Sequence, residues 1–241
     1  MVVNTMDRLS FIRKAEKEYH DYCYENYKLF EKGSWLYKPV KTVMDVLPLF
    51  ENQADLKVLD LGSGVGRNSI PIAKEIKSKN GKVVCVDLLD SALTKLREYS
   101  KEYEVDKVIE TIKADIGHYK IATNEYDFIL AVSTLEHIES KTVFEKVLQY
   151  MALGTKYGGI NCIIVNSEIE EIDIKTNENL DVMMEINSKT TDMLNQLTNI
   201  YQDWEILSQI VKPLEYQIVR DNRDILLKTN AITFVVQKMK S

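Results

Sequence analysis

A glycine-rich stretch next to a carboxylate is the feature of this chain that is most informative about its chemistry. Gly62, Gly64 and Gly66 follow an apolar run that contains Asp60. Glycines at this spacing let the backbone take tight or positive-φ turns, and they let a ligand approach without interference from a Cβ atom. The apolar residues on either side predict a strand that leads through the turn into a helix. This order is the first crossover of a nucleotide-binding α/β sheet.

The charges around this turn distinguish between cofactors. A dinucleotide-binding turn needs its third glycine where this chain has Arg67, and Asp60 would repel a pyrophosphate. S-adenosylmethionine has no phosphate, and its ammonium and sulfonium groups are attracted to a carboxylate. The residues therefore favour S-adenosylmethionine and disfavour NAD.

Two further aspartates follow predicted strands. Asp87 comes directly after the β-branched run 82–86, and the second strand of such a unit ends beside the glycine turn, about twenty residues on. A carboxylate there can accept hydrogen bonds from both ribose hydroxyls. Asp115 lies in a third run, 108–116, where it can accept from the adenine amino group. The alternatives are a solvated strand end for Asp87 and an ordinary turn residue for Asp115.

The run 126–132, which is apolar except for Asp127, predicts a central strand, and the loop that follows it should face the transferred group. That loop contains His137, the only histidine near the expected mouth of the site. His137 is our candidate catalytic residue because an imidazole can accept a proton from a thiol or a hydroxyl. The alternative is that His137 caps the next helix.

Taken together, these motifs resemble the class I S-adenosylmethionine-dependent methyltransferases over about positions 55–165. The strings that carry the resemblance are Asp-Leu-Gly-Ser-Gly-Val-Gly at 60–66, Asp87, Ala114-Asp115, Tyr-Asp-Phe-Ile-Leu at 126–130 and Leu-Glu-His at 135–137. A narrower likeness to the tellurite-resistance methyltransferase branch is carried by Gly-Arg-Asn-Ser at 66–69, the same 126–130 string, Gly-Gly-Ile-Asn at 158–161 and Asp-Trp-Glu at 203–205. This branch implies methyl transfer to a small, soft nucleophile such as a thiol or a chalcogen oxyanion.

The resemblance implies a cofactor site along the glycine turn and the ends of the neighbouring strands. Its expected residues are Asp60, Gly62, Ser63, Gly64, Gly66, Arg67, Asn68, Asp87, Leu88, Ala114, Asp115, Ile116, Val132 and Ser133. Residues 1–50 are predicted to be helical, with apolar residues at near-helical intervals such as Ile12, Tyr19 and Tyr22. This segment either packs on the sheet as an amphipathic helix or forms a lid, in which Tyr27 or Trp35 supplies an aromatic wall for the sulfonium.

The rest of the chain extends the alternation of strands and helices. We predict a helix at 142–153, a turn at Gly158-Gly159, a fifth strand at 160–165, a helix at 190–201 and strands at 204–211 and 231–237. The acidic stretch 166–189 is interpreted as a long insertion that caps the substrate site or, alternatively, as a disordered loop. The expected fold is an α/β, Rossmann-like three-layer sandwich whose mostly parallel seven-stranded sheet has its last strand antiparallel. It forms a single domain, with residues 1–50 as a helical lid segment and 51–241 as the methyltransferase domain.

Composition and net charge limit the classes of binding partner that we expect for this chain. The 241-residue chain has a net charge of −6 and a pI near 5.3, which argues against nucleic acid as a partner. The three cysteines are widely spaced and imply no disulfide framework, and the three histidines are too scattered to indicate a metal site. The sequence predicts no signal peptide and no membrane span, so we expect a cytoplasmic monomer or homodimer that acts on a small-molecule methyl acceptor.

These observations predict an enzyme that transfers a methyl group from S-adenosylmethionine by in-line displacement, in which positioning supplies most of the catalysis. The competing hypothesis is a non-catalytic protein that binds S-adenosylmethionine and acts as a sensor or binds a partner protein.

Overall fold

A mixed sheet forms the centre of the computed structural model, which describes residues 5–220 and 223–239. Its strand order is β3-β2-β1-β4-β5-β8-β7, and the short strand β6 pairs with β5 outside this path. Neighbours from β3 to β5 are parallel, whereas β8 is antiparallel to both β5 and β7. The predicted, mostly parallel sheet with an antiparallel last strand is therefore confirmed, but the described sheet has eight strands and not seven, because the unpredicted β6 pairs with β5. The strands are β1 (Lys57–Leu61), β2 (Lys82–Asp87), β3 (Ile109–Lys113), β4 (Tyr126–Val132), β5 (Thr155–Asp173), β6 (Asn179–Leu180), β7 (Trp204–Arg220) and β8 (Arg223–Lys238).

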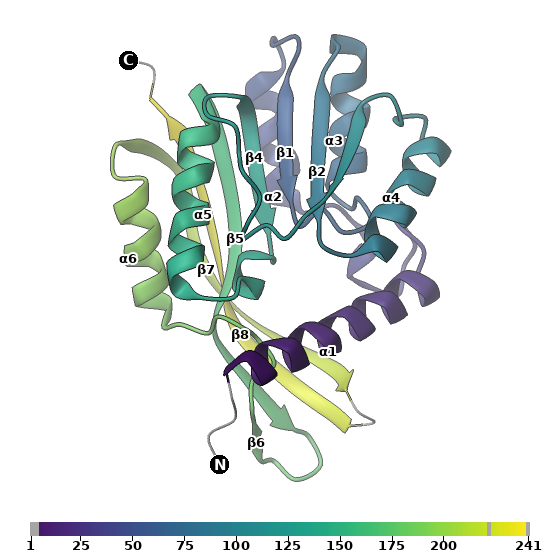
Figure 1. The fold of residues 1–241 in the computed structure, drawn as a ribbon, viewed down its shortest axis with the longest axis vertical. Helices are drawn as coiled ribbons and strands as arrows, with labels where there is room; N and C mark the ends of the chain where they lie inside the picture. The colour runs from purple at the N-terminus through teal and green to yellow at the C-terminus, as the bar shows by residue number, and fades with distance from the viewer. Residues whose placement is uncertain (1–4, 221–222, 240–241) are drawn as a thin grey trace.

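Helices cover both faces of this sheet and complete the three layers (Figure 1). The helices α2, α3 and α4 share one hydrophobic cluster with the sheet, and α5 and α6 share the other. The α-helices are α1 (Thr5–Asn26), α2 (Lys41–Val46), α3 (Ser69–Ile76), α4 (Asp90–Glu102), α5 (Lys141–Gly154) and α6 (Thr190–Ile200). The 3₁₀ helices are η1 (Trp35–Tyr37), η2 (Leu47–Phe50), η3 (Lys77–Lys79) and η4 (Leu135–His137).

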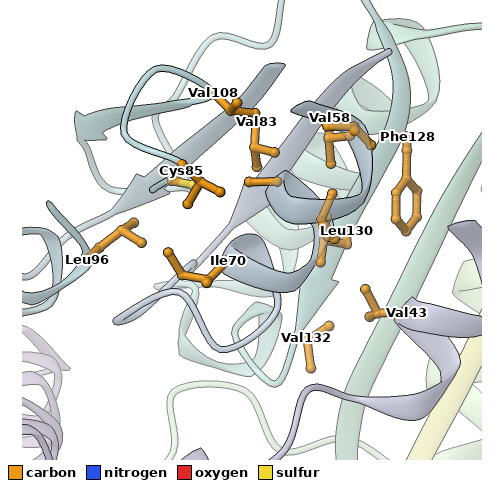
Figure 2. Packing of buried hydrophobic residues seen from close by; sticks show 14 of the residues in the cluster. Val43, Val58, Ile70, Val83, Cys85, Leu96, Val108, Phe128, Leu130 and Val132 are labelled. Atoms are coloured by element: carbon orange, nitrogen blue, oxygen red, sulfur yellow. The ribbon is translucent and has the colours of Figure 1, made fainter. Parts of the chain in front are cut away.

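The two-residue period of a strand explains why the central strands are mostly apolar. Val58 belongs to the cluster on one face of the sheet and its neighbour Leu59 to the cluster on the other, and both are fully buried. Phe128 and Ile129 divide in the same way. Figure 2 shows the first cluster, in which helix residues such as Ile70 lie against the side chains of β1, β2 and β4. A strand that is buried on both faces is therefore mostly apolar, and the buried exceptions in β1 and β4, Asp60 and Asp127, accept hydrogen bonds.

The three longest strands form an antiparallel arm that continues beyond the parallel part of the sheet (Figure 1). β5 pairs with β8 as far as Asp173, and β7 pairs with β8 as far as Arg220. The sequence-based boundaries were therefore wrong here. The predicted turn at Gly158-Gly159 lies inside β5, and the first part of the expected insertion 166–189 is the continuation of β5. The inward positions of that continuation include polar side chains, so hydrophobic periodicity did not reveal the strand.

The N-terminal helix α1 crosses the molecule next to the carboxyl ends of the parallel strands and beside the arm (Figure 1). Its inward face differs from the one predicted. Ile12 and Cys23 are buried as expected, but Tyr19 and Tyr22 are exposed. None of the helices in the described ranges is long and apolar enough to cross a membrane.

Candidate functional site

The glycine turn joins β1 to α3 and is fixed by residues from two other elements. Gly62, Gly64 and Gly66 all have positive φ, at +72°, +53° and +93°. A Cβ atom on Gly62 would lie 2.1 Å from the hydroxyl of Thr134, in the loop after β4, and one on Gly66 would lie 2.4 Å from Leu96 of α4. Glycine is therefore required by conformation and by space, and the turn is held against the loop that follows the central strand.

Asp87, the expected ribose ligand, lies at the end of β2 and holds the glycine turn directly. Its Oδ2 accepts a 2.8 Å hydrogen bond from the backbone N–H of Gly64, and its Oδ1 accepts one of 2.9 Å from the N–H of Leu89. Burial raises the pKa of Asp87, although these backbone N–H groups oppose the shift. The carboxylate thus lies beside the turn as the sequence predicts.

Asp60 is more deeply placed than a residue at an open strand tip. It is 2% exposed and accepts a 2.5 Å hydrogen bond from the hydroxyl of Ser69, the first residue of α3. Burial raises the pKa of Asp60 to about 7, and the nearby charge of Asp87 adds to this effect. Asp60 therefore joins the start of α3 to β1, and its ionisation is sensitive to pH near neutrality.

The end of β3 is tied to the N-terminal helix. Asp115, the expected adenine ligand, receives a 2.9 Å hydrogen bond from the guanidinium of Arg13 on α1 and a 2.8 Å bond from the N–H of Gly117. The backbone N–H of Ala114 donates to the carbonyl of Asp87 at 3.0 Å. The carboxylates after β2 and β3 are thereby brought to one edge of the sheet, next to α1.

Aromatic side chains from the N-terminal region lie over the glycine turn. The hydroxyl of Tyr24 is 3.2 Å from the position that a Cβ on Gly64 would take. Trp35 makes an edge contact with Tyr24, and the guanidinium of Arg67 lies 5.1 Å from the centroid of the Trp35 ring. Of the two predicted wall residues, Trp35 therefore lies near the turn. Tyr27 lies 3.6 Å from the Cβ position of Gly33, and the ring that faces the turn belongs to Tyr24.

The loop after β4 positions the residues that should face the methyl acceptor. Val132 ends β4, and Ser133 has a positive φ of 50°, a conformation that is uncommon outside glycine. Glu136 is 1% exposed, and its Oε1 accepts a 2.5 Å hydrogen bond from Asn166 of β5. Burial raises the pKa of Glu136.

His137 is held among carboxylates. Its Nδ1 lies 3.2 Å from the carboxylate of Glu185, which is 2% exposed. Burial alone would lower the pKa of His137, but the hydrogen bond with Glu185 and the negative charges of Glu16 and Glu136 raise it to about 9. At neutral pH the imidazole is therefore a cation, which is unsuited to accept a proton.

A network of charged side chains connects α1 to the arm. Glu16 lies 3.7 Å from His20, 4.0 Å from His137 and 3.9 Å from Arg220 of β7. Arg220 also pairs with the buried Glu171 of β5 at 2.5 Å. The hydrophobic periodicity of α1 gave no indication of this network. The available signal was the four-residue spacing of Glu16, His20 and Tyr24, which places them on one face of a helix.

The other predicted site residues lie around the same turn. Asn68 accepts a 2.9 Å hydrogen bond from the N–H of Val40 and so connects the turn to the segment before α2. Leu88 is exposed, and Ile116 is half-buried after β3.

Three buried side-chain polar atoms lack a hydrogen-bond partner among the described residues, namely Ser63 Oγ, His20 Nδ1 and Glu136 Oε2. Buried polar groups are nearly always paired, so unpaired ones indicate positions for a ligand or water. They come from the glycine turn, the helix α1 and the loop after β4. An open-backbone turn, an adjacent carboxylate and unpaired polar atoms fit the polar groups of S-adenosylmethionine. In the same described ranges, no group of three or more histidine, cysteine, aspartate or glutamate side chains could hold a metal ion.

Comparisons with known proteins identify similarities to methyltransferases and related enzymes. Residues 58–159 match a family described as a methyltransferase domain. The carboxy-S-adenosyl-L-methionine synthase of Shewanella sediminis is 24% identical over 174 residues, which cover 71% of this chain and 69% of the synthase. Phosphoethanolamine N-methyltransferase 1 of Triticum aestivum is 29% identical over 154 residues, which cover 61% of this chain but only 29% of the wheat protein.

Among solved structures, TehB from Haemophilus influenzae superposes with a TM-score of 0.61 at 22% identity. The match covers 81% of this chain and 62% of the TehB chain. At this identity the likeness shows that the two proteins share a fold.

Proposed function

We propose that residues 58–159, which match a family described as a methyltransferase domain, form a class I S-adenosylmethionine-dependent methyltransferase domain, and that the chain methylates a small-molecule nucleophile, namely a thiol, a chalcogen oxyanion or a similar group. The observation that carries the proposal is the joining of three elements at one sheet edge. Asp87 after β2 is hydrogen-bonded to the glycine turn after β1, and Thr134 after β4 lies against the same turn. A ligand at this turn would therefore contact all three.

The residues at this edge suggest a role for each part of the cofactor. Asp87 would accept from the ribose hydroxyls, and Asp115 would accept from the adenine amino group. The backbone of the glycine turn and the unpaired hydroxyl of Ser63 would face the methionine part. When bound, S-adenosylmethionine supplies a methyl group on a sulfonium, and Trp35 with Tyr24 would form the aromatic wall beside that positive charge.

The acceptor site is proposed to lie between α1, the loop after β4 and the arm. The segment 181–187 approaches that loop, because the N–H of Ile186 donates to the carbonyl of Glu136 at 2.9 Å. Residues 166–189 thus supply part of the proposed cap, and residues 1–50 supply the proposed lid. Enclosure by three segments would exclude water from the reacting groups, which strengthens the electrostatic interactions inside.

Two measurements test this function. Isothermal titration with S-adenosylhomocysteine tests the cofactor site. Formation of S-adenosylhomocysteine from S-adenosylmethionine with dithiothreitol, selenite or tellurite tests methyl transfer. Phosphoethanolamine is included as an acceptor because of the name of the wheat relative. Turnover with any acceptor supports the enzyme, whereas binding without turnover would favour the sensor.

A further inference from the structure

His20 lies on the inward face of α1 and has one ring nitrogen without a partner. Its Nε2 is 3.7 Å from the carboxylate of Glu16, one turn earlier on the helix. Its Nδ1 is buried and has no hydrogen-bond partner among the described residues. In a neutral imidazole one nitrogen donates and the other accepts. A carboxylate next to Nε2 favours the tautomer that carries its proton there, which leaves Nδ1 as a proton acceptor.

The position of His20 places this acceptor between the two halves of the proposed site. Tyr24, one turn later on the same face of α1, reaches the glycine turn. Glu16, one turn earlier, lies 4.0 Å from Nε2 of His137 in the loop after β4. His20 therefore lies along α1 between the residue that faces the cofactor turn and the residue that faces the acceptor loop. The rings of Tyr24 and Trp35 flank it, with centroids 5.6 and 5.9 Å away.

We propose that His20 is the general base that takes the proton from the methyl acceptor, with Glu16 as the residue that orients it. This inference rests on the proposed function. As the nucleophile bonds to the methyl carbon, the bond from that carbon to the sulfonium sulfur breaks and its electron pair stays on sulfur. The proton of the nucleophile passes to Nδ1 of His20, and the resulting imidazolium is stabilised by the Glu16 carboxylate. A base held by an adjacent carboxylate is a recurring arrangement in enzymes.

The charges around His137 and His20 favour different protonation states for the two imidazoles. His137 is held as a cation by Glu185, Glu16 and Glu136, so its proton is not available for exchange at neutral pH. Burial lowers the pKa of His20, and the positive charge of His137 lowers it further. The negative charges of Glu16 and Asp21 oppose these shifts. The other groups next to His20 are the uncharged rings of Tyr19, Tyr24 and Trp35. The lowered pKa favours the neutral imidazole, which is the form that a base needs.

The first test is a measurement on the protein without turnover. The chain has only three histidines, so their ring ¹⁵N and ¹H resonances can be assigned by single His→Gln variants and followed from pH 5 to pH 10. We expect His20 to titrate below 6.5 with Nδ1 unprotonated in its neutral form, and His137 to titrate well above it. A neutral His20 that carries its proton on Nδ1, or a His20 that is still charged at pH 7.5, would overturn the proposal. Because the titration is measured on the wild-type protein, it tests the proposal even if the His20→Gln variant used in the second test fails to fold.

The second test compares His20→Gln, Glu16→Gln and the control His118→Gln, whose side chain is 64% exposed. We measure single-turnover methylation of dithiothreitol, or of whichever panel acceptor reacts, together with S-adenosylhomocysteine affinity. His20→Gln should lower the methylation rate by about 10²–10⁴-fold and abolish the decrease of this rate at acidic pH. The dissociation constant for S-adenosylhomocysteine should stay within about twofold of the wild-type value. Glu16→Gln should lower the rate less, and the control should change neither quantity.

The outcomes separate this inference from the function on which it rests. Turnover within about threefold of wild type in a folded His20→Gln protein would overturn the base and leave the methyltransferase intact. No turnover by the wild type with any acceptor would overturn both.

Discussion

Replacement of Asp87 by alanine should weaken two properties that the structure connects, the stability of the glycine turn and the affinity for the cofactor. The carboxylate is 9% exposed and accepts two backbone hydrogen bonds, from Gly64 at 2.8 Å and from Leu89 at 2.9 Å. A hydrogen bond to a charged group contributes about 1.5–3 kcal/mol. Because burial raises the pKa of Asp87, part of this gain offsets the cost of holding the charge. We therefore expect Asp87→Ala to lower the free energy of unfolding by about 2 kcal/mol.

The effect on the cofactor is a second, separate quantity. Loss of the proposed bonds to ribose should cost about 1–3 kcal/mol of binding free energy, so that the dissociation constant for S-adenosylhomocysteine rises about 5- to 150-fold. Urea unfolding at pH 7 measures the first quantity and isothermal titration the second. Asp90→Ala is the matched control, because Asp90 lies three residues later with its side chain 75% exposed. It should change the unfolding free energy by less than about 0.5 kcal/mol.

The dissociation constant and the unfolding free energy test two separate roles of Asp87. An unchanged dissociation constant in a folded Asp87→Ala protein would show that Asp87 does not bind the ribose. An unchanged unfolding free energy would show that its two backbone bonds do not hold the turn. Equal losses in the Asp90 control would point to a general effect of removing negative charge.

Two further predictions follow from the geometry of the turn and the charge of the loop after β4. In urea unfolding, Gly62→Ala should destabilise the protein by about 1–3 kcal/mol more than Gly64→Ala. Both glycines have positive φ, but a Cβ atom on Gly62 would lie 2.1 Å from a threonine hydroxyl. Equal losses of unfolding free energy in the two variants would contradict the packing described for the turn. His137 should contribute stability that is fully present below its ordinary pKa of 6.5 and is lost as the pH rises through about 9, because its folded-state pKa is raised. The difference in unfolding free energy between wild type and His137→Gln should therefore shrink from pH 6 to pH 10, and a constant difference would show that His137 is not held as a cation.

The parallel half of the sheet and the glycine turn could be predicted from the sequence because local patterns specify them. The boundaries predicted for the central strand, 126–132, are those of β4. The helices predicted at 142–153 and 190–201 lie within a residue of the ends of α5 and α6. Strands buried on both faces must be mostly apolar, and a turn with three positive-φ positions needs glycine. These requirements leave a signal in a single stretch of chain.

The arm and the charged network could not be predicted in this way. Beyond residue 165, inward positions of β5 hold Ser167 and Glu171, which read as loop residues until their partners are known. Ser167 bonds to the carbonyl of Asn230, and Glu171 pairs with Arg220. On α1, the apolar spacing predicted an inward face with Tyr19 and Tyr22, yet both side chains are exposed. The inward face of the helix instead includes the polar residues Glu16 and His20, and Glu16 contacts residues far away in the chain.

The sequence by itself determined where the glycine turn lies and which carboxylates lie at the ends of the neighbouring strands, because backbone conformation and burial restrict residue types locally. Only the tertiary structure decided the protonation state of the groups around the loop after β4. His137 is the clearest case, since its charge depends on Glu16 and Glu185, which lie 121 and 48 positions away in the chain. The energy of a charged group depends on which other charges and how much water lie within a few ångströms, and a single stretch of sequence does not specify either.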